Sequence, residues 1–169
     1  MTKHMRPTRL AAGFTFLVIV SLALSLPGCT YTSGWKSGEA ARRPTVVESA
    51  VVSFTFAQRK QGTRREFFEY VRSVLDQLPA ASGLLGYAFK FELLGDKAWT
   101  ITAWESEQAL DRFVFTGMHR KALNQSEALL AESRFTRVTL PHSELPPDWS
   151  LVMSQLHPNP EATKPTTKP

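Results

Sequence analysis

Residues 97–123 read KAWTITAWESEQALDRFVFTGMHRKAL, and this stretch contains a strand, a helix start and candidate pocket residues in succession. Large apolar side chains alternate with threonines over residues 97–104, which predicts a strand. Ser106 then supplies a helix cap, apolar residues recur at helical spacing after it, and Gly117 is expected to end the helix. The pattern therefore changes from strand to helix at the Trp-Glu-Ser-Glu turn of residues 104–107.

The chain on either side of this stretch also shows strand-like alternation and helix-like spacing of apolar residues. Thr63 and Glu66 form a T-x-x-E capping box, an amphipathic stripe follows, and Pro79 is expected to close that helix. The expected elements are a strand at 46–58, a helix at 63–78, strands at 84–93 and 97–104, a helix at 107–133 with a break near Gly117, a strand at 134–140 and a short terminal helix after Pro146.

Large apolar residues occupy both faces of the two central strands. On the strand at 84–93, alternation predicts that Leu85 shares one face with Tyr87, Phe89 and Phe91, and Gly95-Asp96 supplies a hairpin turn. On the strand at 97–104, Trp99 and Ile101 are predicted on one face and Trp104 on the other. The order β-α-β-β-α-β predicts an α+β, ferredoxin-like antiparallel sheet with both helices on one face.

That fold leaves the second, apolar face of the sheet without a cover. Packing against another copy of the chain is the simplest way to bury it, so we expect a homodimer with two-fold symmetry. The alternative is a monomer that exposes an apolar patch.

The first 28 residues have the features of an export signal. A basic leader is followed by an uncharged apolar run over residues 10–26, and then by Pro27, Gly28 and Cys29, the only cysteine. This arrangement resembles a bacterial lipoprotein signal peptide, which implies cleavage before Cys29 and acylation of it. The alternatives are an ordinary secretory signal with an incidental cysteine, or an uncleaved membrane helix.

The lipoprotein resemblance implies a location in the cell envelope, with the domain anchored to a lipid bilayer and facing the periplasm or the exterior. Thr30 rather than Asp follows Cys29, which by the same resemblance favours an outer membrane if the cell has one. Residues 29–45 are interrupted by Gly, Ser and Pro and are predicted to form a flexible tether. The domain is expected at 46–156 and a disordered tail, rich in Pro, Thr and Lys, at 157–169.

Charge and composition limit the classes of function. The chain has 20 Lys and Arg against 15 Asp and Glu, and removing Lys3, Arg6 and Arg9 with the leader leaves 17 against 15, or +2. No clustered basic face is evident, so a nucleic-acid partner is not expected. The histidines show no ligand spacing, so no metal site is expected.

The element order, the Trp-Glu-Ser-Glu turn, the Phe-rich helix and the His at its end resemble the dimeric α+β barrel superfamily that includes the antibiotic-biosynthesis monooxygenases. The resemblance covers about residues 47–140 and implies a mostly apolar cavity between sheet and helices. Some members oxidise polycyclic aromatic compounds without a cofactor, and others degrade haem. Where the haem-degrading branch has Trp, His and Asn, this chain has Phe113, Leu123 and Thr55, so neither haem nor another cofactor is expected.

Six residues near the strand–helix junction are candidates for a site. His119 could accept or donate a proton near a cavity mouth, or it could simply bond carbonyls at the helix end. The aromatic residues could line a pocket for a flat ligand or belong to the core, and the arginines could hold an anionic group or be solvated surface. The candidates other than His119 are Trp104, Tyr87, Phe113, Arg112 and Arg120.

Two hypotheses of different class follow from the sequence. In one, a membrane-anchored domain binds a hydrophobic small molecule and acts as a cofactor-independent monooxygenase on an aromatic compound. In the other, an envelope lipoprotein uses the fold as a binding or interaction scaffold without catalysis, since a fold does not by itself carry an activity.

Overall fold

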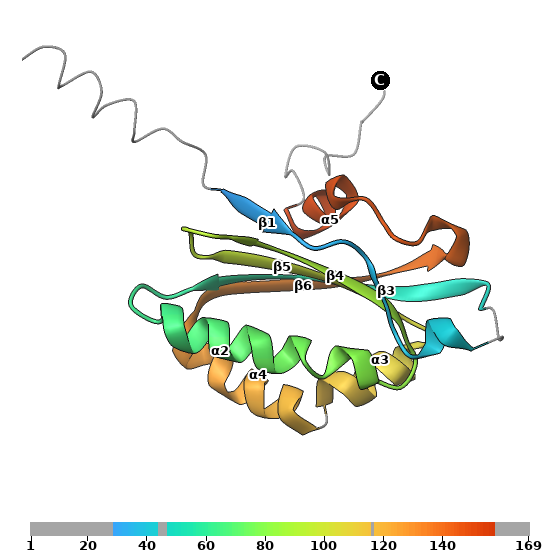
Figure 1. Ribbon diagram of the computed structural model, residues 1–169, viewed down its shortest axis with the longest axis horizontal. Helices are drawn as coiled ribbons and strands as arrows, with labels where there is room; N and C mark the ends of the chain where they lie inside the picture. Colours follow the sequence, from blue (N-terminus) through green and yellow to red (C-terminus); the bar gives the residue numbers. More distant parts are fainter. Residues whose placement is uncertain (1–28, 44–46, 116, 158–169) are drawn as a thin grey trace, which may run out of the picture.

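The structure is a computed structural model that describes residues 29–43, 47–115 and 117–157. The predicted signal segment at 1–28 and the tail from residue 158 onward lie outside the described residues. The described chain has three layers, with one sheet between a lower layer of helices α2, α3 and α4 and an upper helix α5 (Figure 1). Within the described residues, no helix combines the length and apolar character needed to cross a bilayer.

The sheet is antiparallel, and its strands follow the order β1-β4-β5-β3-β6, with β2 also paired to β4. The strands are β1 (Thr30–Thr32), β2 (Lys36–Ser37), β3 (Ser49–Arg59), β4 (Leu84–Glu92), β5 (Lys97–Trp104) and β6 (Leu130–Pro141). The helices are α2 (Arg64–Leu75), α3 (Glu107–Phe115), α4 (Gly117–Leu129) and α5 (Trp149–Leu156), with short 3-10 turns η1 (Ala40–Arg42), η2 (Leu78–Ala80) and η3 (His142–Glu144). The succession β3-α2-β4-β5-α3/α4-β6 confirms the predicted ferredoxin-like α+β class.

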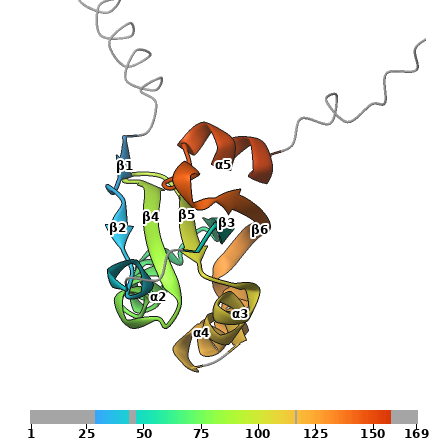
Figure 2. The same ribbon diagram turned by 90° about the vertical axis from the view of Figure 1, so that its right-hand side faces the viewer.

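The lower helices cover one face of the sheet. Figure 2 shows α2 beneath β4, and α3 and α4 beneath the side of the sheet that carries β6. Trp104 and Leu84 are fully buried in this layer, where Tyr87 and Leu110 also pack. The alternation predicted for residues 97–104 is confirmed, because Trp104 lies on this face while Trp99, Ile101 and Ala103 lie on the other.

The second face of the sheet is covered by the chain itself, which corrects the premise of the predicted dimer. Val152 and Leu156 of α5 pack on Phe54, Ile101 and neighbouring residues, and Val152 and Phe54 are both 0% exposed. Burying an aliphatic side chain of this size stabilises a fold by about 1.5–3 kcal/mol. The second copy that the sequence analysis invoked is therefore not needed to remove this face from water.

The segment expected to be a flexible tether is also packed on the domain. β1 and β2 extend the sheet at the outer edge of β4, and η1 follows them. The backbone N–H of Ser33 donates to the Phe89 carbonyl at 2.8 Å, and the Phe89 N–H donates back to the Ser33 hydroxyl at 2.9 Å. Trp35 rests on the backbone of Gly86, a position where a Cβ atom would come within 2.4 Å of the indole. The prediction failed because Gly and Ser signal irregular chain but not whether an exposed strand edge is nearby to pair with it.

A β-bulge in β4 changes which side chains face the helices. Leu84 pairs with Trp104, but Gly86 rather than Leu85 pairs with Ala103, so the register shifts between Leu84 and Gly86. Leu85 consequently packs in the upper cluster with α5, while Tyr87 packs in the lower cluster. The prediction that Leu85 and Tyr87 share a face is therefore wrong, because one extra residue reverses the alternation on one side of it.

Some predicted element ends also differ from those observed. Thr63 precedes α2, but its hydroxyl donates to the carbonyls of Lys60 and Leu129 instead of capping the helix. α2 ends at Leu75, and Pro79 lies in the separate turn η2. The expected break near Gly117 is present, since α3 ends at Phe115, whereas β6 begins at Leu130 rather than at residue 134.

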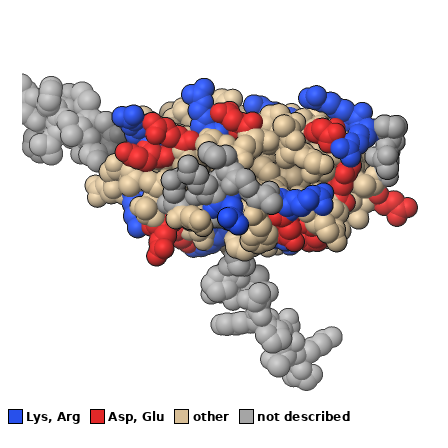
Figure 3. Space-filling view, turned by 90° about the horizontal axis from the view of Figure 1, so that it is seen from below, with Lys and Arg blue, Asp and Glu red and all other residues tan. Residues whose placement is uncertain are grey.

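Charged side chains of both signs are interspersed on the face of the described residues drawn in Figure 3. Some form exposed pairs within one helical turn, such as Arg65 with Glu69 at 3.0 Å. Pairs this exposed contribute little to stability, typically about 0–1 kcal/mol.

A glycine comparison tests the packing of the N-terminal segment. A Cβ atom at Gly38 would come within 2.1 Å of the Leu84 carbonyl oxygen, whereas one at Gly34 meets nothing within 4 Å. We expect Gly38→Ala to lower the free energy of unfolding by about 1–3 kcal/mol, as overpacking usually does. Gly34→Ala is the matched control and should be nearly neutral in urea denaturation. Equal stability of the two variants would contradict the packed arrangement.

Candidate functional site

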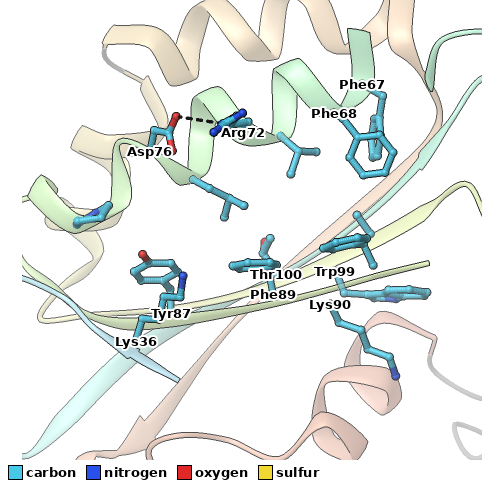
Figure 4. Close-up of a pocket in the computed structure, with 15 residues that line it drawn as sticks. Lys36, Phe67, Phe68, Arg72, Asp76, Tyr87, Phe89, Lys90, Trp99 and Thr100 are labelled. Carbon is cyan, nitrogen blue, oxygen red and sulfur yellow. Dashed lines mark ion pairs between the residues drawn. The ribbon is translucent and has the colours of Figure 1, made fainter. Parts of the chain in front are cut away.

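A cavity of about 460 Å³ lies between α2 and the strands β4 and β5. Figure 4 shows Phe67 and Phe68 on the helix side of the cavity and Tyr87 and Phe89 on the sheet side. Phe91 and Thr100 complete the part of the wall formed by the sheet. The wall is therefore mainly aromatic, with the hydroxyls of Tyr87 and Thr100 as polar groups.

Two sequence periods bring these aromatic residues together. On α2, Phe68, Val71 and Leu75 recur at spacings of three and four residues, which places them along the side of the helix that lines the cavity. On β4, Tyr87, Phe89 and Phe91 alternate toward the same side once the bulge has been passed. The rings of Phe68 and Phe91 meet edge to face across the gap, with centroids 5.9 Å apart.

The mouth of the cavity is charged. Lys36 of β2 places its Nζ atom 5.3 Å from the ring centroid of Phe89 and 5.8 Å from that of Tyr87. Arg72 and Asp76 of α2 form an exposed pair with an N–O distance of 4.0 Å. Lys36 therefore offers an ammonium group directly beside the aromatic wall.

Tyr87 is the one predicted site residue on the cavity wall, because Trp104, Phe113 and His119 form a separate aromatic stack. The ring centroids of Trp104 and Phe113 are 5.1 Å apart, and those of Phe113 and His119 are 4.9 Å apart. Trp104 is 0% exposed, and its indole N–H donates to the Thr102 hydroxyl at 2.9 Å. Trp104 and Phe113 belong to the packed core of the lower layer, which supports the core alternative for both.

His119 is half-buried at the end of this stack. Burial lowers the pKa of its imidazole below the ordinary value of 6.5, so the ring is favoured in its neutral form. Its Nδ1 atom has no hydrogen-bond partner among the described residues. The imidazole is not part of the cavity wall, so it is not placed to exchange a proton with a molecule in this cavity.

The charged candidates of the same region lie at the surface. Arg112 and Arg120 are both exposed and do not line the cavity. Glu107 and Asp111 of α3 pair with Arg137 of β6 at 2.9 and 2.8 Å. These ion pairs join α3 to the edge strand β6 and lie outside the cavity.

Sequence reasoning missed most of the cavity wall. The sequence predicts an amphipathic stripe on this helix without a cavity beside Phe67 and Phe68, and it places Lys36 in a flexible tether. The adjacent Phe67-Phe68 pair is a usable signal, because two neighbouring large rings widen the apolar face of a helix beyond a single row of side chains. Lys36 carried no comparable signal, since its position depends on the pairing of β2 with β4.

The wall offers little for a metal or a cofactor. No group of three or more His, Cys, Asp or Glu side chains suited to a metal ion occurs among the described residues. The lining includes the hydroxyls of Tyr87 and Thr100 and the charged side chains of Lys36, Arg72, Asp76 and Lys90. This set is suited to orienting an apolar molecule that carries one or two polar groups.

Comparison with solved structures shows the fold. The chain is similar to PA3566 from Pseudomonas aeruginosa, with a TM-score of 0.51, 17% identity, and coverage of 56% of this chain and 96% of that chain. It is similar to SO0527 from Shewanella oneidensis, with a TM-score of 0.51, 10% identity, and coverage of 63% and 97%. A protein of unknown function from Nitrosomonas europaea, NE2512, has a TM-score of 0.50, 16% identity, and coverage of 60% and 98%. No family model and no curated protein matches the sequence.

These findings define the class of the domain. It is an α+β domain of ferredoxin-like topology with an aromatic cavity between α2 and the sheet. The match covers 96–98% of the length of each of these three proteins, so each of them consists almost entirely of the matched domain. At identities of 10–17%, the likeness extends to the fold and not to an activity.

The environment of His119 predicts a dependence of stability on pH. Since burial lowers the pKa of folded His119, the unfolded chain binds more protons than the folded chain as pH falls below about 6.5. The free energy of unfolding should therefore fall with decreasing pH in this range, by up to about 1.4 kcal/mol per pH unit from this group. His119→Leu should lose part of this dependence in urea denaturation at several pH values.

The control for this prediction is His142→Gln, which removes another imidazole and leaves the ring stacked on Phe113 in place. An identical pH dependence in His119→Leu and wild type would show that protonation of His119 is not linked to folding.

Proposed function

We propose that residues 47–157, together with the packed segment at 30–42, bind an apolar small molecule that has an aromatic body and an acidic group. The observation that carries this proposal is the cavity of about 460 Å³ walled by Phe67, Phe68, Tyr87 and Phe89. Small-molecule sites in proteins are usually apolar hollows of about 300–1,000 Å³ with a few polar groups. Both the volume and the lining of this cavity lie within that description.

The cavity selects for flat, apolar molecules because most of its wall is aromatic. Rings of a ligand could stack on Phe89 or meet Phe68 edge-on, the two geometries that aromatic pairs prefer. The hydroxyls of Tyr87 and Thr100 are placed to hydrogen-bond a polar substituent. Lys36 at the mouth would attract a carboxylate, sulfonate or phosphate at the outer end of the ligand.

The geometry favours binding over oxidation. A cofactor-independent monooxygenase needs a group that takes a proton from its substrate, and the only imidazole suggested for that role, His119, stacks on Phe113 away from the cavity wall. The cavity lining instead includes the hydroxyls of Tyr87 and Thr100, the carboxyl group of Asp76 and the ammonium groups of Lys36 and Lys90 as groups that exchange protons. The proposed function is therefore a binding domain, and the monooxygenase activity implied by the family resemblance is an extension of it that would rely on Tyr87.

We further propose that the domain is attached to a bilayer in the cell envelope through acylated Cys29. The lipoprotein-like residues before Cys29 support this proposal, and Cys29 itself is exposed at the start of β1, where acyl chains would meet no steric obstacle. Several chains, or one chain with a second contact, are needed for stable attachment.

A homodimer stays a proposal, but it requires a surface other than the face under α5. The outer edge of β6 is a candidate because it is the last strand of the sheet and Phe135 on it is 74% exposed. Pairing of two β6 strands about a two-fold axis would extend the sheet across both copies.

Ligand binding is tested by filling the cavity from α2. We expect Val71→Trp to weaken binding of the fluorescent probe N-phenyl-1-naphthylamine about tenfold, which corresponds to about 1.4 kcal/mol of binding free energy. The matched control is Glu69→Trp, which adds the same ring at a position on α2 that is exposed and outside the cavity. Equal probe affinity in both variants would show that the probe binds elsewhere.

The role of Lys36 is tested with an anionic relative of the same probe. Lys36→Gln should weaken binding of 8-anilino-1-naphthalenesulfonate by about two- to fivefold, as expected for a partly exposed charge pair of up to about 1 kcal/mol. Binding of the neutral N-phenyl-1-naphthylamine should be unchanged. Parallel losses for both probes would argue against an acidic group at the mouth.

Attachment through Cys29 is tested by fractionation of cells that express the full chain. Cys29→Ser removes the thiol that would be acylated, and we expect the protein to move from the membrane fraction to the soluble fraction. Thr30→Ser, a neighbouring conservative change, is the control and should stay with the membrane. If Cys29→Ser fractionates as wild type does, the acyl anchor is not what holds the protein.

A further inference from the structure

The turn between β4 and β5 exposes two large aliphatic side chains. Leu94 is 79% exposed and Leu93 is 42% exposed, and Tyr31 on the neighbouring strand β1 is 47% exposed. The turn itself does not require leucines, because Gly95 and Asp96 supply the residues that tight turns favour. Leu93, Leu94 and Tyr31, called here the tip, form an exposed apolar surface at this end of the described chain.

The tip is adjacent to the proposed lipid attachment residue. The backbone N–H of Leu93 donates to the carbonyl oxygen of Cys29 at 2.8 Å. Thr30 then pairs with Glu92, and Tyr31 pairs with Phe91, so β1 holds this arrangement in register. Figure 1 shows the β4–β5 hairpin and the start of β1 at the same end of the molecule. Acyl chains on Cys29 would therefore bring the tip to the bilayer surface.

Basic side chains surround the tip. Arg64 Nη2 donates to the Leu93 carbonyl at 2.8 Å, and Arg59 Nη2 donates to the Gly95 carbonyl at 3.4 Å. Lys97 follows the turn and pairs with Gln58 beside Arg59, so three cations lie in or beside the segments that meet here, whereas Lys60 Nζ donates to the Glu127 carbonyl of α4 at 2.7 Å.

The two carboxylates of the turn are already engaged within it. Asp96 accepts a hydrogen bond from Gln58 Nε2 at 2.8 Å, and Glu92 accepts one from the Asp96 N–H at 3.2 Å. These hydrogen bonds come from neutral donors and leave both carboxylates charged, so the three cations Arg59, Arg64 and Lys97 exceed the two carboxylates by one charge. This combination of an apolar tip and a basic surround complements a bilayer surface that carries anionic headgroups.

We propose that the tip inserts into the headgroup region of an anionic bilayer and is a second membrane contact beside Cys29. The leucines and Tyr31 enter the interface, and Arg64, Arg59 and Lys97 pair with lipid phosphates. A single acyl chain binds a membrane only marginally, so a second contact of this kind stabilises attachment and fixes the orientation of the domain.

The orientation has a consequence for the proposed ligand site, and this step rests on that proposed function. Phe91 lines the cavity and also packs on Tyr31, with ring centroids 5.2 Å apart. A docked tip would hold this end of the cavity wall close to the bilayer, where an apolar aromatic molecule would be concentrated.

The test places an environment-sensitive fluorophore on the tip of the full chain. Leu94→Cys is labelled with such a dye, and Phe115→Cys on α3, a site that is 59% exposed and outside the tip, is the matched control. Both proteins are reconstituted into vesicles of phosphatidylethanolamine and phosphatidylglycerol, with a fraction of the lipids carrying a nitroxide quencher. Mass spectrometry establishes whether Cys29 is acylated and therefore unlabelled.

We expect the dye at residue 94 to shift to shorter wavelength and to be quenched by the nitroxide lipids, while the dye at residue 115 keeps its emission in water. Aqueous emission without quenching at residue 94 on vesicle-bound protein would overturn the proposal. Arg64→Gln, and vesicles without phosphatidylglycerol, should each reduce quenching at residue 94. Quenching unaffected by both changes would overturn the pairing with anionic headgroups.

The outcome is separable from the other proposals. If mass spectrometry finds Cys29 unmodified, the same labels are read in the Cys29→Ser protein with added vesicles, where the dye is still expected to be quenched at residue 94 and not at residue 115. If the cavity fails to bind the naphthyl probes, the quenching of the dye at residue 94 is still expected, because insertion of the tip does not depend on a ligand.

Discussion

Burial of the central sheet from both sides is the constraint on which the rest of the structure depends. β3 and β5 carry large apolar side chains on both faces, so Phe54 and Ile101 need a cover as much as Trp104 does. α2, α3 and α4 provide one layer, and α5 provides the other from within the same chain. Because α5 occupies the second face, the remaining free surfaces are the strand edges, the helix exteriors and the two ends of the sheet.

The outer edge of β4 determines the shape of the proposed binding site. The bulge at Leu85 turns Tyr87 and Phe89 toward α2, and the pairing of β2 brings Lys36 beside their rings. The segment of residues 30–42 thus contributes a cation beside the rings of Tyr87 and Phe89 on the sheet side of the cavity wall. Loss of the packing at Gly38 would therefore alter the mouth of the cavity as well as stability.

The proposed functions converge on one end of the molecule. Cys29, the Leu93–Leu94 turn and the Phe91 end of the cavity are linked through β1 by backbone pairing and ring contacts. An acyl anchor, an apolar tip and an aromatic cavity at one end are a consistent set for a domain that takes apolar molecules at a bilayer. The separate stack of Trp104, Phe113 and His119 contributes to the core, and its histidine contributes a sensitivity of stability to acid.

The sequence by itself determined the order of the elements, the ferredoxin-like class and the alternation of Trp99 and Trp104, because these follow from local periodicity. Only the tertiary structure decided the cover of the second face, the pairing of residues 30–37 with β4, the side taken by Leu85 and the location of the cavity. Each of these depends on contacts between segments far apart in the chain. A short amphipathic helix such as α5 or an irregular Gly- and Ser-rich segment does not encode its packing partner in its own pattern, since that partner is defined only once the sheet has formed.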